Sequence, residues 1–340
     1  MAEPVVGVDG APPGRRTPGP RGRRLLRAAA TVVGVSAVFA CAAGVFAHYS
    51  GFVSSTASRV AAFTPVLVIV GVVGFVVLLL ARRWIVAGIA ALVVVAGVVT
   101  QAPLYVGASS AADSDLVVMQ ANIYLGQADI VSLASTVRAE DVDLLTIVEL
   151  TEGALNRIEV SDLAVALPYS FTHALPDGRG VGIFSKYPLV DGRVLDGFRL
   201  GNVRAETDLP GHGRTAVYAL HPLPPWPEAA WRWDLEMSRL SDILAAEALP
   251  TIVGADMNST WDHRPFRRML AGYGPDTSPD LLDAAEVVGA GFVPTYPADK
   301  AIPPLLTIDH VLTRGGLQPT SMHTVTLVGS DHRGVVATVR

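Results

Sequence analysis

Residues 251–258 read TIVGADMN, a short apolar run that ends in Asp256 and Asn258. Small and β-branched apolar residues in a run of this length predict a buried strand. A packed core has no use for a carboxylate, so the two polar side chains belong at the end of the strand. Loops at the ends of rigid strands commonly carry catalytic groups. The stretch therefore predicts a buried sheet with functional side chains at its edge.

The same pattern recurs from residue 115 to residue 340. Short apolar runs predict strands at 116–121, 144–148, 180–184, 215–220, 251–254, 306–312 and 334–339, and periodic segments predict helices at 128–138, 229–247 and 263–270. This mixture indicates one α/β domain with buried sheets covered by helices. Polar side chains at the strand ends are the candidate functional residues: Asn122, Glu149, His221, Asp256, Asn258, Asp309, Asp331 and His332.

The N-terminal third has a different composition. Residues 1–27 are rich in Pro, Gly and Arg and lack periodic apolar positions, which predicts a disordered basic tail in the cytoplasm. Charge-free apolar stretches follow at 28–50, 60–81 and 84–106. Each is close to the ~20 residues that cross a bilayer, so residues 28–106 are predicted to form an anchor of three transmembrane helices.

Basic side chains set the expected orientation. The cluster Arg21–Arg27 and the pair Arg82-Arg83 fall on the same side of a three-span path, which the positive-inside rule assigns to the cytoplasm. The last span then leads through a small-residue linker, 107–114, to a catalytic domain, 115–340, outside the cell membrane. A cleaved signal peptide is the alternative for the first stretch, but it does not explain the two later spans.

The charge distribution narrows the function. Mean hydropathy is high, at +0.41. The first 114 residues hold nine Lys and Arg against three Asp and Glu, whereas the rest of the chain holds 17 against 28. Polyanions such as DNA are normally held by a basic face, so no stable nucleic-acid complex is expected. Cys41 is the single cysteine, which excludes an intrachain disulfide and a cysteine-based zinc site.

The ordered series of strand-end residues resembles the endonuclease/exonuclease/phosphatase superfamily. The landmarks are QANIY around Asn122, IVE ending at Glu149, GVGIFSKYPL at 180–189, ALHP with His221, GADMN with Asp256 and Asn258, IDHV with Asp309, and SDH with Asp331 and His332. The resemblance implies two packed β-sheets flanked by helices, a four-layer sandwich. It also implies a metal-dependent hydrolase that acts on phosphoester or pyrophosphate bonds.

The resemblance assigns the metal to Glu149, assisted by Asn122 and Asp331. The metal it implies is Mg²⁺, with Mn²⁺ as the alternative. The residue types agree, because Mg²⁺ prefers carboxylate and amide oxygens and retains several waters. Tyr124 departs from the family pattern, since nuclease members often carry an acidic residue at this position. The departure favours the phosphatase-like branches.

The remaining landmarks receive catalytic roles from the same resemblance. His332 pairs with Asp309 and acts either as a general base or as a contact to the phosphate. Asp256 orients or deprotonates the attacking water. Asn258 and His221 donate hydrogen bonds to the phosphoryl oxygens as charge develops.

Several tryptophans, basic residues and histidines of the domain also have expected positions. The segment 221–233 carries Trp226, Trp231 and Trp233. We expect a helix that buries Trp231, Leu235 and Ser238, with contact to the membrane or to a lipid chain as the alternative. Arg179 or Lys186 is a further candidate near the substrate. His173, His212, His263 and His323 match no landmark and are expected on the surface or in the core.

Three spans ahead of such a domain also resemble the VanJ-type glycopeptide-resistance membrane proteins. That resemblance implies an extracytoplasmic phosphatase acting at the bilayer on a lipid-linked pyrophosphate such as undecaprenyl pyrophosphate, or on another envelope phosphate ester. A linker-tethered domain should keep its rate on a soluble analogue after the spans are removed. The alternatives are an extracytoplasmic nuclease or phospholipase-type phosphodiesterase, and a non-catalytic membrane receptor or scaffold. A scaffold needs none of the eight polar landmarks.

Overall fold

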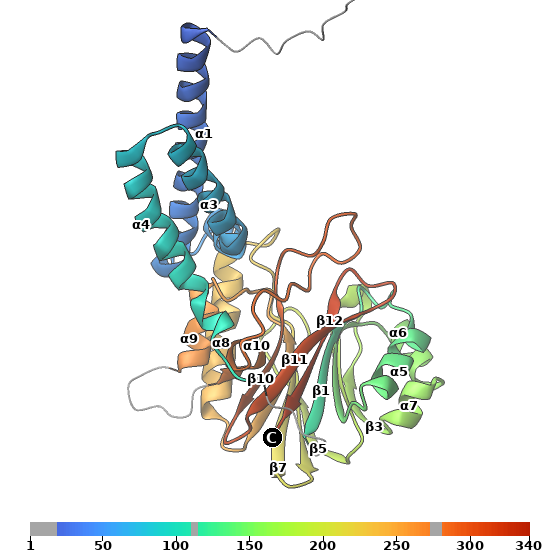
Figure 1. The fold of residues 1–340 in the computed structure, drawn as a ribbon. Helices are drawn as coiled ribbons and strands as arrows, with labels where there is room; N and C mark the ends of the chain where they lie inside the picture. Colours follow the sequence, from blue (N-terminus) through green and yellow to red (C-terminus); the bar gives the residue numbers. More distant parts are fainter. Residues whose placement is uncertain (1–18, 110–114, 273–280) are drawn as a thin grey trace, which may run out of the picture.

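The computed structural model describes residues 19–109, 115–272 and 281–340. A bundle of apolar helices stands on one side of an α/β domain (Figure 1). The first helix, α1 (Pro20–Ser50), begins earlier than predicted, so residues 20–27 are helical rather than part of a disordered tail. Proline suits the first turn of a helix, and Arg and Leu favour helix formation. The rest of the predicted tail, residues 1–18, lies outside the described residues.

The domain contains two six-stranded sheets. Sheet A has the order β11 (Pro319–Thr326), β12 (Arg333–Val339), β1 (Leu116–Asn122), β2 (Leu144–Leu150), β4 (Gly180–Ser185), β3 (Tyr169–His173). Sheet B has the order β5 (Leu189–Val194), β6 (Val203–Leu209), β7 (Gly213–Leu220), β8 (Thr251–Asp256), β10 (Asp309–Arg314), β9 (Leu282–Asp283). Each sheet is mixed, because β1 and β2 are parallel in one, and β7 and β8 are parallel in the other.

The two sheets pack face to face and helices cover their outer sides. A buried core of Val, Ile, Leu and Ala fills the space between the sheets. Helices α5 (Ile130–Ala139), α6 (Glu152–Glu159) and α7 (Asp162–Ala166) cover sheet A, and α8 (Ala230–Ala246) and α9 (Arg264–Ala271) cover sheet B. The short elements are η1 (Ala102–Tyr105), η2 (Pro176–Gly178) and α10 (Ala284–Val287). The predicted pair of packed sheets flanked by helices is confirmed.

The element predictions need several corrections. All seven predicted strands are present, but residues 306–308 precede β10 and only Leu306 pairs, in an isolated bridge to Tyr296. Strands β3, β5, β6, β9 and β11 were not predicted. In α8 the expected buried face was wrong: Trp231 is 60% exposed and Leu235 57% exposed, whereas Trp233 is buried. The helix is rotated relative to the prediction, so that Trp233, Met237 and Leu240 form its inner stripe.

One glycine sets the closest approach of the two sheets. A Cβ built on Gly254 of β8 would lie 1.9 Å from Thr146 Oγ1 of β2. The Thr146 hydroxyl is fixed, because it donates to Gln120 Oε1 at 2.5 Å in the buried interior. The space therefore accepts only a hydrogen on residue 254.

We predict that Gly254→Ala destabilises the protein by at least the roughly 1–3 kcal/mol typical of overpacking, because Thr146 must leave its hydrogen bond. Thermal unfolding of the full chain measures the loss. Gly153→Ala is the control, since Gly153 lies in helix α6 and a Cβ built there would meet only Arg157 Nη1, at 3.9 Å, outside the helix backbone. Alanine favours helices, so this variant should be neutral or more stable. Equal melting temperatures for the two variants would contradict the close contact.

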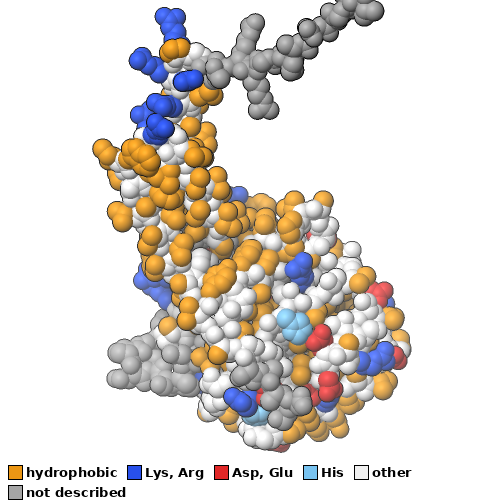
Figure 2. Space-filling view, viewed as in Figure 1, with side chains coloured by type: hydrophobic (Ala, Val, Ile, Leu, Met, Phe, Trp, Pro, Cys, Tyr) orange, Lys and Arg blue, Asp and Glu red, His pale blue; other side chains and the backbone are white. Residues whose placement is uncertain are grey.

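The N-terminal bundle consists of α1, α2 (Ser55–Ala62), α3 (Thr64–Leu80) and α4 (Trp84–Gln101). Two helical segments are long and apolar enough to cross a membrane, Pro20–Ser50 and Trp84–Tyr105. Helix α3 has 17 residues and qualifies only together with α2, from which it is bent by 66°. Of the three predicted spans, two therefore have the length and composition to cross a membrane, and the third has them only if α2 and α3 form one bent span. Apolar side chains cover the bundle, and Lys and Arg gather at its end far from the domain (Figure 2).

The bundle is docked on the domain through buried polar contacts rather than tethered by a linker. Asp262 Oδ1 lies 2.7 Å from His48 Nδ1 of α1, and accepts from Gln101 Nε2 of α4 at 2.9 Å. Trp261 Nε1 donates to Thr100 O at 3.0 Å, and Arg264 Nη1 donates to Ser50 O at 3.2 Å. The arginine thus satisfies a carbonyl that the end of α1 leaves without a helical partner.

Backbone geometry where α1 meets the domain is equally restricted. Gly51 ends α1 with φ +62°, and a Cβ there would lie 2.7 Å from Arg264 Cδ. The described part of the predicted linker also packs, since Ser109 Oγ donates to Thr320 O at 3.1 Å. Residues 110–114 of the linker lie outside the described residues. The expectation of an independently acting, tethered domain is not supported by these contacts.

Candidate functional site

Strand topology explains why the predicted site residues meet. The parallel strands β1 and β2 end beside Asn122 and Glu149, and the parallel strands β7 and β8 end beside His221 and Asp256. Antiparallel strands begin at the same edge: Asp309 opens β10 directly opposite Asp256, and His332 immediately precedes β12. The carboxyl ends of both parallel pairs and the amino ends of their antiparallel neighbours therefore form one polar cluster.

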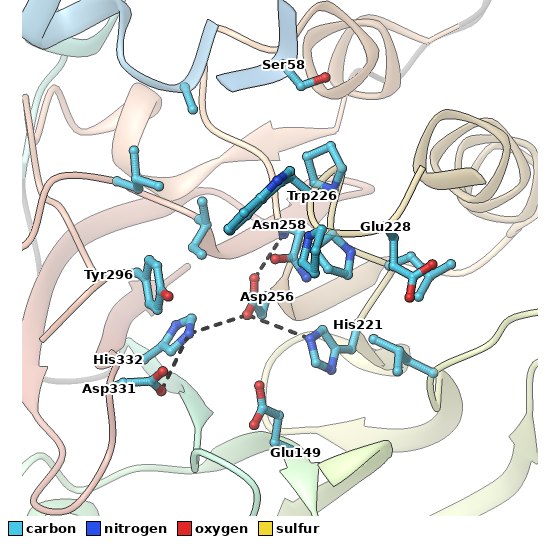
Figure 3. A pocket seen from close by; sticks show the side chains of 18 of the residues that line it. Ser58, Glu149, His221, Trp226, Glu228, Asp256, Asn258, Tyr296, Asp331 and His332 are labelled. Atoms are coloured by element: carbon cyan, nitrogen blue, oxygen red, sulfur yellow. Dashed lines mark hydrogen bonds and ion pairs between the residues drawn. The ribbon is translucent and has the colours of Figure 1, made fainter. Parts of the chain in front are cut away.

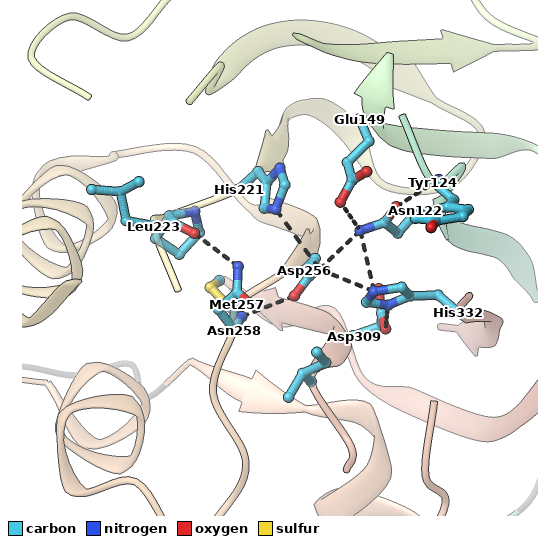
Figure 4. A network of polar contacts seen from close by, with 12 residues as sticks. Asn122, Tyr124, Glu149, His221, Leu223, Asp256, Met257, Asn258, Asp309 and His332 are labelled. Carbon is cyan, nitrogen blue, oxygen red and sulfur yellow. Dashed lines mark hydrogen bonds and ion pairs between the residues drawn. The ribbon is translucent and has the colours of Figure 1, made fainter. Parts of the chain in front are cut away.

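Asn122 connects the two sheets at the centre of this cluster (Figure 4). Its Nδ2 atom donates to Glu149 Oε1 and to Asp256 Oδ2, each at 3.0 Å, and lies 3.4 Å from His332 Nε2. Its Oδ1 atom accepts from the backbone of Tyr124 at 2.9 Å. In this orientation the carboxamide presents its nitrogen, not its oxygen, to the carboxylates. Direct ligation of a metal by Asn122 would require its carboxamide to rotate.

Glu149 is held in a conformation that non-glycine residues rarely adopt. It has φ +60°, at a bulge in β2 between Val148 and Leu150. Its Oε2 atom accepts from Leu125 N at 2.6 Å. Backbone strain of this kind concentrates at functional sites, and bulges re-aim side chains. The bulge turns the Glu149 carboxylate toward Asp256 and His221, as the labelled side chains in Figure 3 show.

His332 and Asp309 form a buried pair. His332 Nδ1 lies 2.8 Å from Asp309 Oδ2, and both side chains are buried. Burial opposes the imidazolium charge, but the adjacent Asp309 carboxylate outweighs it and raises the pKa of His332 to about 10. His332 is therefore protonated near neutrality, and Nε2 points toward Asp256 at 3.8 Å. A cationic hydrogen-bond donor fits a contact to phosphate better than a general base.

Asp256 lies between two histidines. Its Oδ2 atom is 3.8 Å from Nε2 of both His221 and His332, and its Oδ1 atom accepts from Asn258 N at 2.9 Å. Burial, followed by the charge of Asp309, raises the pKa of the Asp256 carboxyl. A more basic carboxylate is better suited to accept a proton from water.

His221 and Asn258 are each held by a hydrogen bond within the protein. His221 N donates to Asn202 Oδ1 at 2.8 Å, while its buried Nδ1 has no hydrogen-bond partner among the described residues. Asn258 Nδ2 donates to Pro222 O at 3.0 Å, which fixes the loop after His221 to the end of β8. Sequence reasoning missed Asn202, because it lies in no landmark and positions His221 only through long-range folding.

Asp331 supplies a second carboxylate near Glu149. Burial raises the pKa of Asp331 to about 6, and the charge of Glu149 raises it further, whereas the charge of His332 lowers it. The buried Oδ1 atom has no hydrogen-bond partner in the described chain. A cation between Glu149 and Asp331 would satisfy this oxygen and remove the repulsion between the carboxylates. This donor set fits a hard divalent ion.

A second arrangement must be compared with it. Among the described residues, Asp256, Asp309 and His332 bring their potential ligand atoms within 4.8 Å of one another. The raised pKa of His332 keeps its imidazole protonated, so this group already holds one positive charge. We therefore favour the Glu149 and Asp331 side for the metal, with the buried triad as the other candidate.

The cluster opens into a cavity of about 620 Å³. Several lining residues carry no signal in the sequence: Arg59 and Phe63 from the helical bundle, and Asp177, Arg199, His263 and Tyr296 from the domain. Trp226, for which contact with the membrane or a lipid chain is the alternative expectation, also lines the cavity. Tyr296 lies against His332, with ring centroids 4.8 Å apart. Lys186, which was suggested to lie near the substrate, does not line the cavity and pairs with Asp141 and Asp143 instead. Arg179 does not line the cavity either.

The chain belongs to the endonuclease/exonuclease/phosphatase family, whose model matches residues 119–332. Solved structures agree on the fold. A humanized variant of D. rerio TDP2 is 15% identical over 67% of this chain and 100% of its own, with a TM-score of 0.54. Truncated Caenorhabditis elegans TDP2 is 16% identical over 66% and 98%, with a TM-score of 0.51.

A third similar structure is a mutant beta toxin from Staphylococcus aureus with bound magnesium ions. It is 15% identical over 66% of this chain and 99% of its own, with a TM-score of 0.50. A comparison with proteins of curated function gave no match. The chain has the fold of this family. The members of the family are metal-dependent phosphodiesterases and phosphatases.

We predict that Asp309→Asn and His332→Ala each slow turnover, and that the double variant is little slower than the slower single variant. The two groups act as a unit, so their effects should not add. Steady-state rates with Mg²⁺ give the coupling. The control is Asp283→Asn, which alters a second buried pair, to His310 Nδ1 at 3.1 Å, outside the cavity. Additive losses at Asp309 and His332, or an equal loss in the control, would contradict the assignment.

Proposed function

We propose that the protein is a membrane-anchored, Mg²⁺-dependent phosphoesterase that hydrolyses a lipid-linked phosphate or pyrophosphate at the outer face of the cell membrane. One observation carries the proposal: the cavity that contains Glu149, Asp256 and His332 is also lined by residues of the apolar helical bundle. These residues belong to α2 and Phe63, which connect the apolar helices α1 and α3, so the cavity lies where the bundle meets the domain. A substrate anchored in a bilayer could reach a cavity in that place. Undecaprenyl pyrophosphate, the substrate class implied by the similarity to VanJ-type proteins, has the required chemistry.

The side chains of the site support direct in-line attack by water. Asp256 accepts the proton of the attacking water, because burial and the charge of Asp309 raise its pKa. Protonated His332 donates from Nε2 to a phosphoryl oxygen and is held in this state by Asp309. Asn122 keeps Glu149 and Asp256 at a fixed separation. His221 supplies a further donor on the opposite side of Asp256.

Glu149 and Asp331 are the proposed metal ligands. Mg²⁺ bound there would neutralise phosphate charge and stabilise the leaving oxygen. Magnesium ions are present in the structure of the beta toxin, which shares the fold. That precedent makes Mg²⁺ the first ion to test, before Mn²⁺.

The bundle supports a defined orientation in the membrane. Arg83 Nε donates to Thr31 Oγ1 at 2.9 Å, which places the basic α3–α4 turn beside the basic start of α1. From Thr31 to Ser50, α1 is about 30 Å long at 1.5 Å per residue, the thickness of a hydrocarbon core. The proposed path has three spans, with α3 as the second and α2 at the outer surface. The catalytic domain then lies outside the cytoplasm.

We predict that Glu149→Gln leaves less than about a tenth of wild-type turnover, since loss of a metal carboxylate normally removes several kcal/mol of transition-state stabilisation. The assay uses the full chain in nanodiscs with Mg²⁺ or EDTA, and offers a lipid pyrophosphate, a lipid monophosphate, sphingomyelin and single-stranded DNA. Glu152→Gln, three residues away and exposed on α6, is the matched control. Preferential cleavage of DNA or sphingomyelin would replace the proposed substrate.

Membrane topology is tested separately. We predict that alkaline phosphatase fused after Arg340 is active, whereas the same reporter fused after Arg83 is inactive. The reason is that alkaline phosphatase folds only outside the cytoplasm. A fluorescent cytoplasmic reporter at the same two positions should give the reverse result. Cytoplasmic signal from the fusion after Arg340 would overturn the proposed compartment.

A further inference from the structure

We propose that α2 is a substrate-binding element in which Arg59 binds the second phosphate of a lipid pyrophosphate, while the adjoining lipid chain lies between Phe63 and Trp226. The inference rests on the proposed function and specifies how the same site recognises its substrate. It assigns a binding role to a segment outside the matched family region, which spans residues 119–332.

Helix α2 lies across the cavity from the metal side. Ser58 and Trp226 are on one side of the cavity and Glu149 is on the other, with Asp256 between them (Figure 3). Ser58, Arg59, Ala62 and Phe63 line the cavity although they belong to the bundle. A substrate that reaches Asp256 from this side must therefore pass α2.

Arg59 is the cation of the cavity wall that remains available. Among the residues that the structure describes, two Lys or Arg side chains line the cavity, Arg59 and Arg199. Arg199 Nη1 lies 3.9 Å from Glu228 Oε2. Arg59 forms no ion pair with any carboxylate in the described part of the chain. Its Nε donates to Ser55 O at 3.1 Å, whereas its terminal nitrogens have no acceptor among the described residues. Such a free guanidinium edge suits bidentate binding of phosphate.

The charge of the cavity makes this cation necessary for a substrate with two phosphates. Five carboxylates line the wall: Glu149, Asp177, Glu228, Asp256 and Asp331. The proposed metal and His332 neutralise the reacting phosphate, but neither lies on the α2 side. A second phosphate there would face net negative charge without Arg59.

The surface beside Arg59 is apolar and continuous with the bundle. The Arg59 guanidinium lies over the Trp226 ring, 5.6 Å from its centroid, and Trp226 is 56% exposed. Phe63 joins α2 to the apolar helix α3, and Leu223, Pro224 and Pro225 continue the wall toward His221. These contacts place an apolar path between the bundle and the charged pocket. An isoprenoid or acyl chain matches that path because it can continue from the apolar bundle to the pocket.

The position of α2 is fixed by its contact with His263 of the domain. The buried imidazole of His263 lies beside the Ser58 backbone and accepts at Nδ1 from Thr260 N at 2.9 Å. Burial lowers the pKa of His263 to about 4, so the ring is neutral and packs edge-on against Trp233. Arg59 is therefore held at a fixed place on the wall rather than on a flexible loop.

The test compares one prenyl chain carrying either a pyrophosphate or a monophosphate. Full-length wild type, Arg59→Gln, Arg59→Lys and the control Arg193→Gln, an exposed arginine on β5, are assayed with Mg²⁺. Arg59→Gln should raise KM for the pyrophosphate roughly 10- to 100-fold, as expected for a lost hydrogen bond between charged groups, with kcat changed little. The rise for the monophosphate should be at least fivefold smaller. Arg59→Lys should recover part of the loss, because it restores the charge.

The outcomes separate the inference from the proposed function. Equal KM changes for both substrates, or an Arg59→Gln variant that behaves like Arg193→Gln, would overturn the role of Arg59 while wild-type activity upholds the function. A wild type inactive on both substrates would refute the proposed function. Calorimetric binding of inorganic pyrophosphate with Mg²⁺ then still tests the arginine, since its affinity should fall in Arg59→Gln. Should that variant unfold, Arg59→Lys provides the same comparison of the two substrates, with a smaller expected difference in KM because the charge is retained.

Discussion

The carboxamide nitrogen of Asn122 lies 3.0 Å from Glu149 Oε1 and 3.0 Å from Asp256 Oδ2, and this bridge joins the two sheets at the edge where their parallel strands end. Sheet A carries the proposed metal ligands Glu149 and Asp331, and sheet B carries Asp256, the proposed acceptor of the water proton. Neither sheet alone holds the whole proposed site. Their separation is set deeper in the core, where Gly254 permits close contact with Thr146. Packing between the sheets and chemistry at their edge are therefore linked through a few fixed distances.

The site edge could be predicted from the sequence because its signals are local. Asn122, Glu149 and Asp256 each stand at or near the end of a short apolar run, and polar side chains in that position mark the edge of a buried sheet. The missed strands lack that contrast. Strand β6 contains Arg204 and Glu206, which resemble loop residues until the fold pairs Arg204 with Glu247 at 2.7 Å and Glu206 with Arg214 at 2.7 Å. Strands β3 and β5 lie at sheet edges with many exposed positions, so the alternation of apolar residues is weak.

The contribution of the bundle to the site could not be predicted from the sequence. Residues 51–59 are a short polar connection with a single charge, and their spacing gives no sign that Arg59 faces Trp226, which lies far along the chain. The buried contact between His48 and Asp262 is equally remote in sequence, so the linker appeared to be a tether. In α8, the pattern predicted a helix but not which side of it faces the sheet, because two tryptophans two residues apart fit opposite faces. Long-range pairing, not propensity, decided all three.

The buried contact of Asp262 with His48 and Gln101 has a consequence for how the protein would choose among lipids. Because that contact fixes the domain relative to the helices, the catalytic cluster stands at one height above the bilayer on the proposed orientation. A headgroup that holds its phosphate too deep or too far out would miss the cluster even if its shape matched the cavity. Selection among lipids would then depend on the height of the phosphate above the bilayer as well as on chemical complementarity. A shift of the docking contact by one helical turn would change the height of the catalytic cluster by about 5 Å.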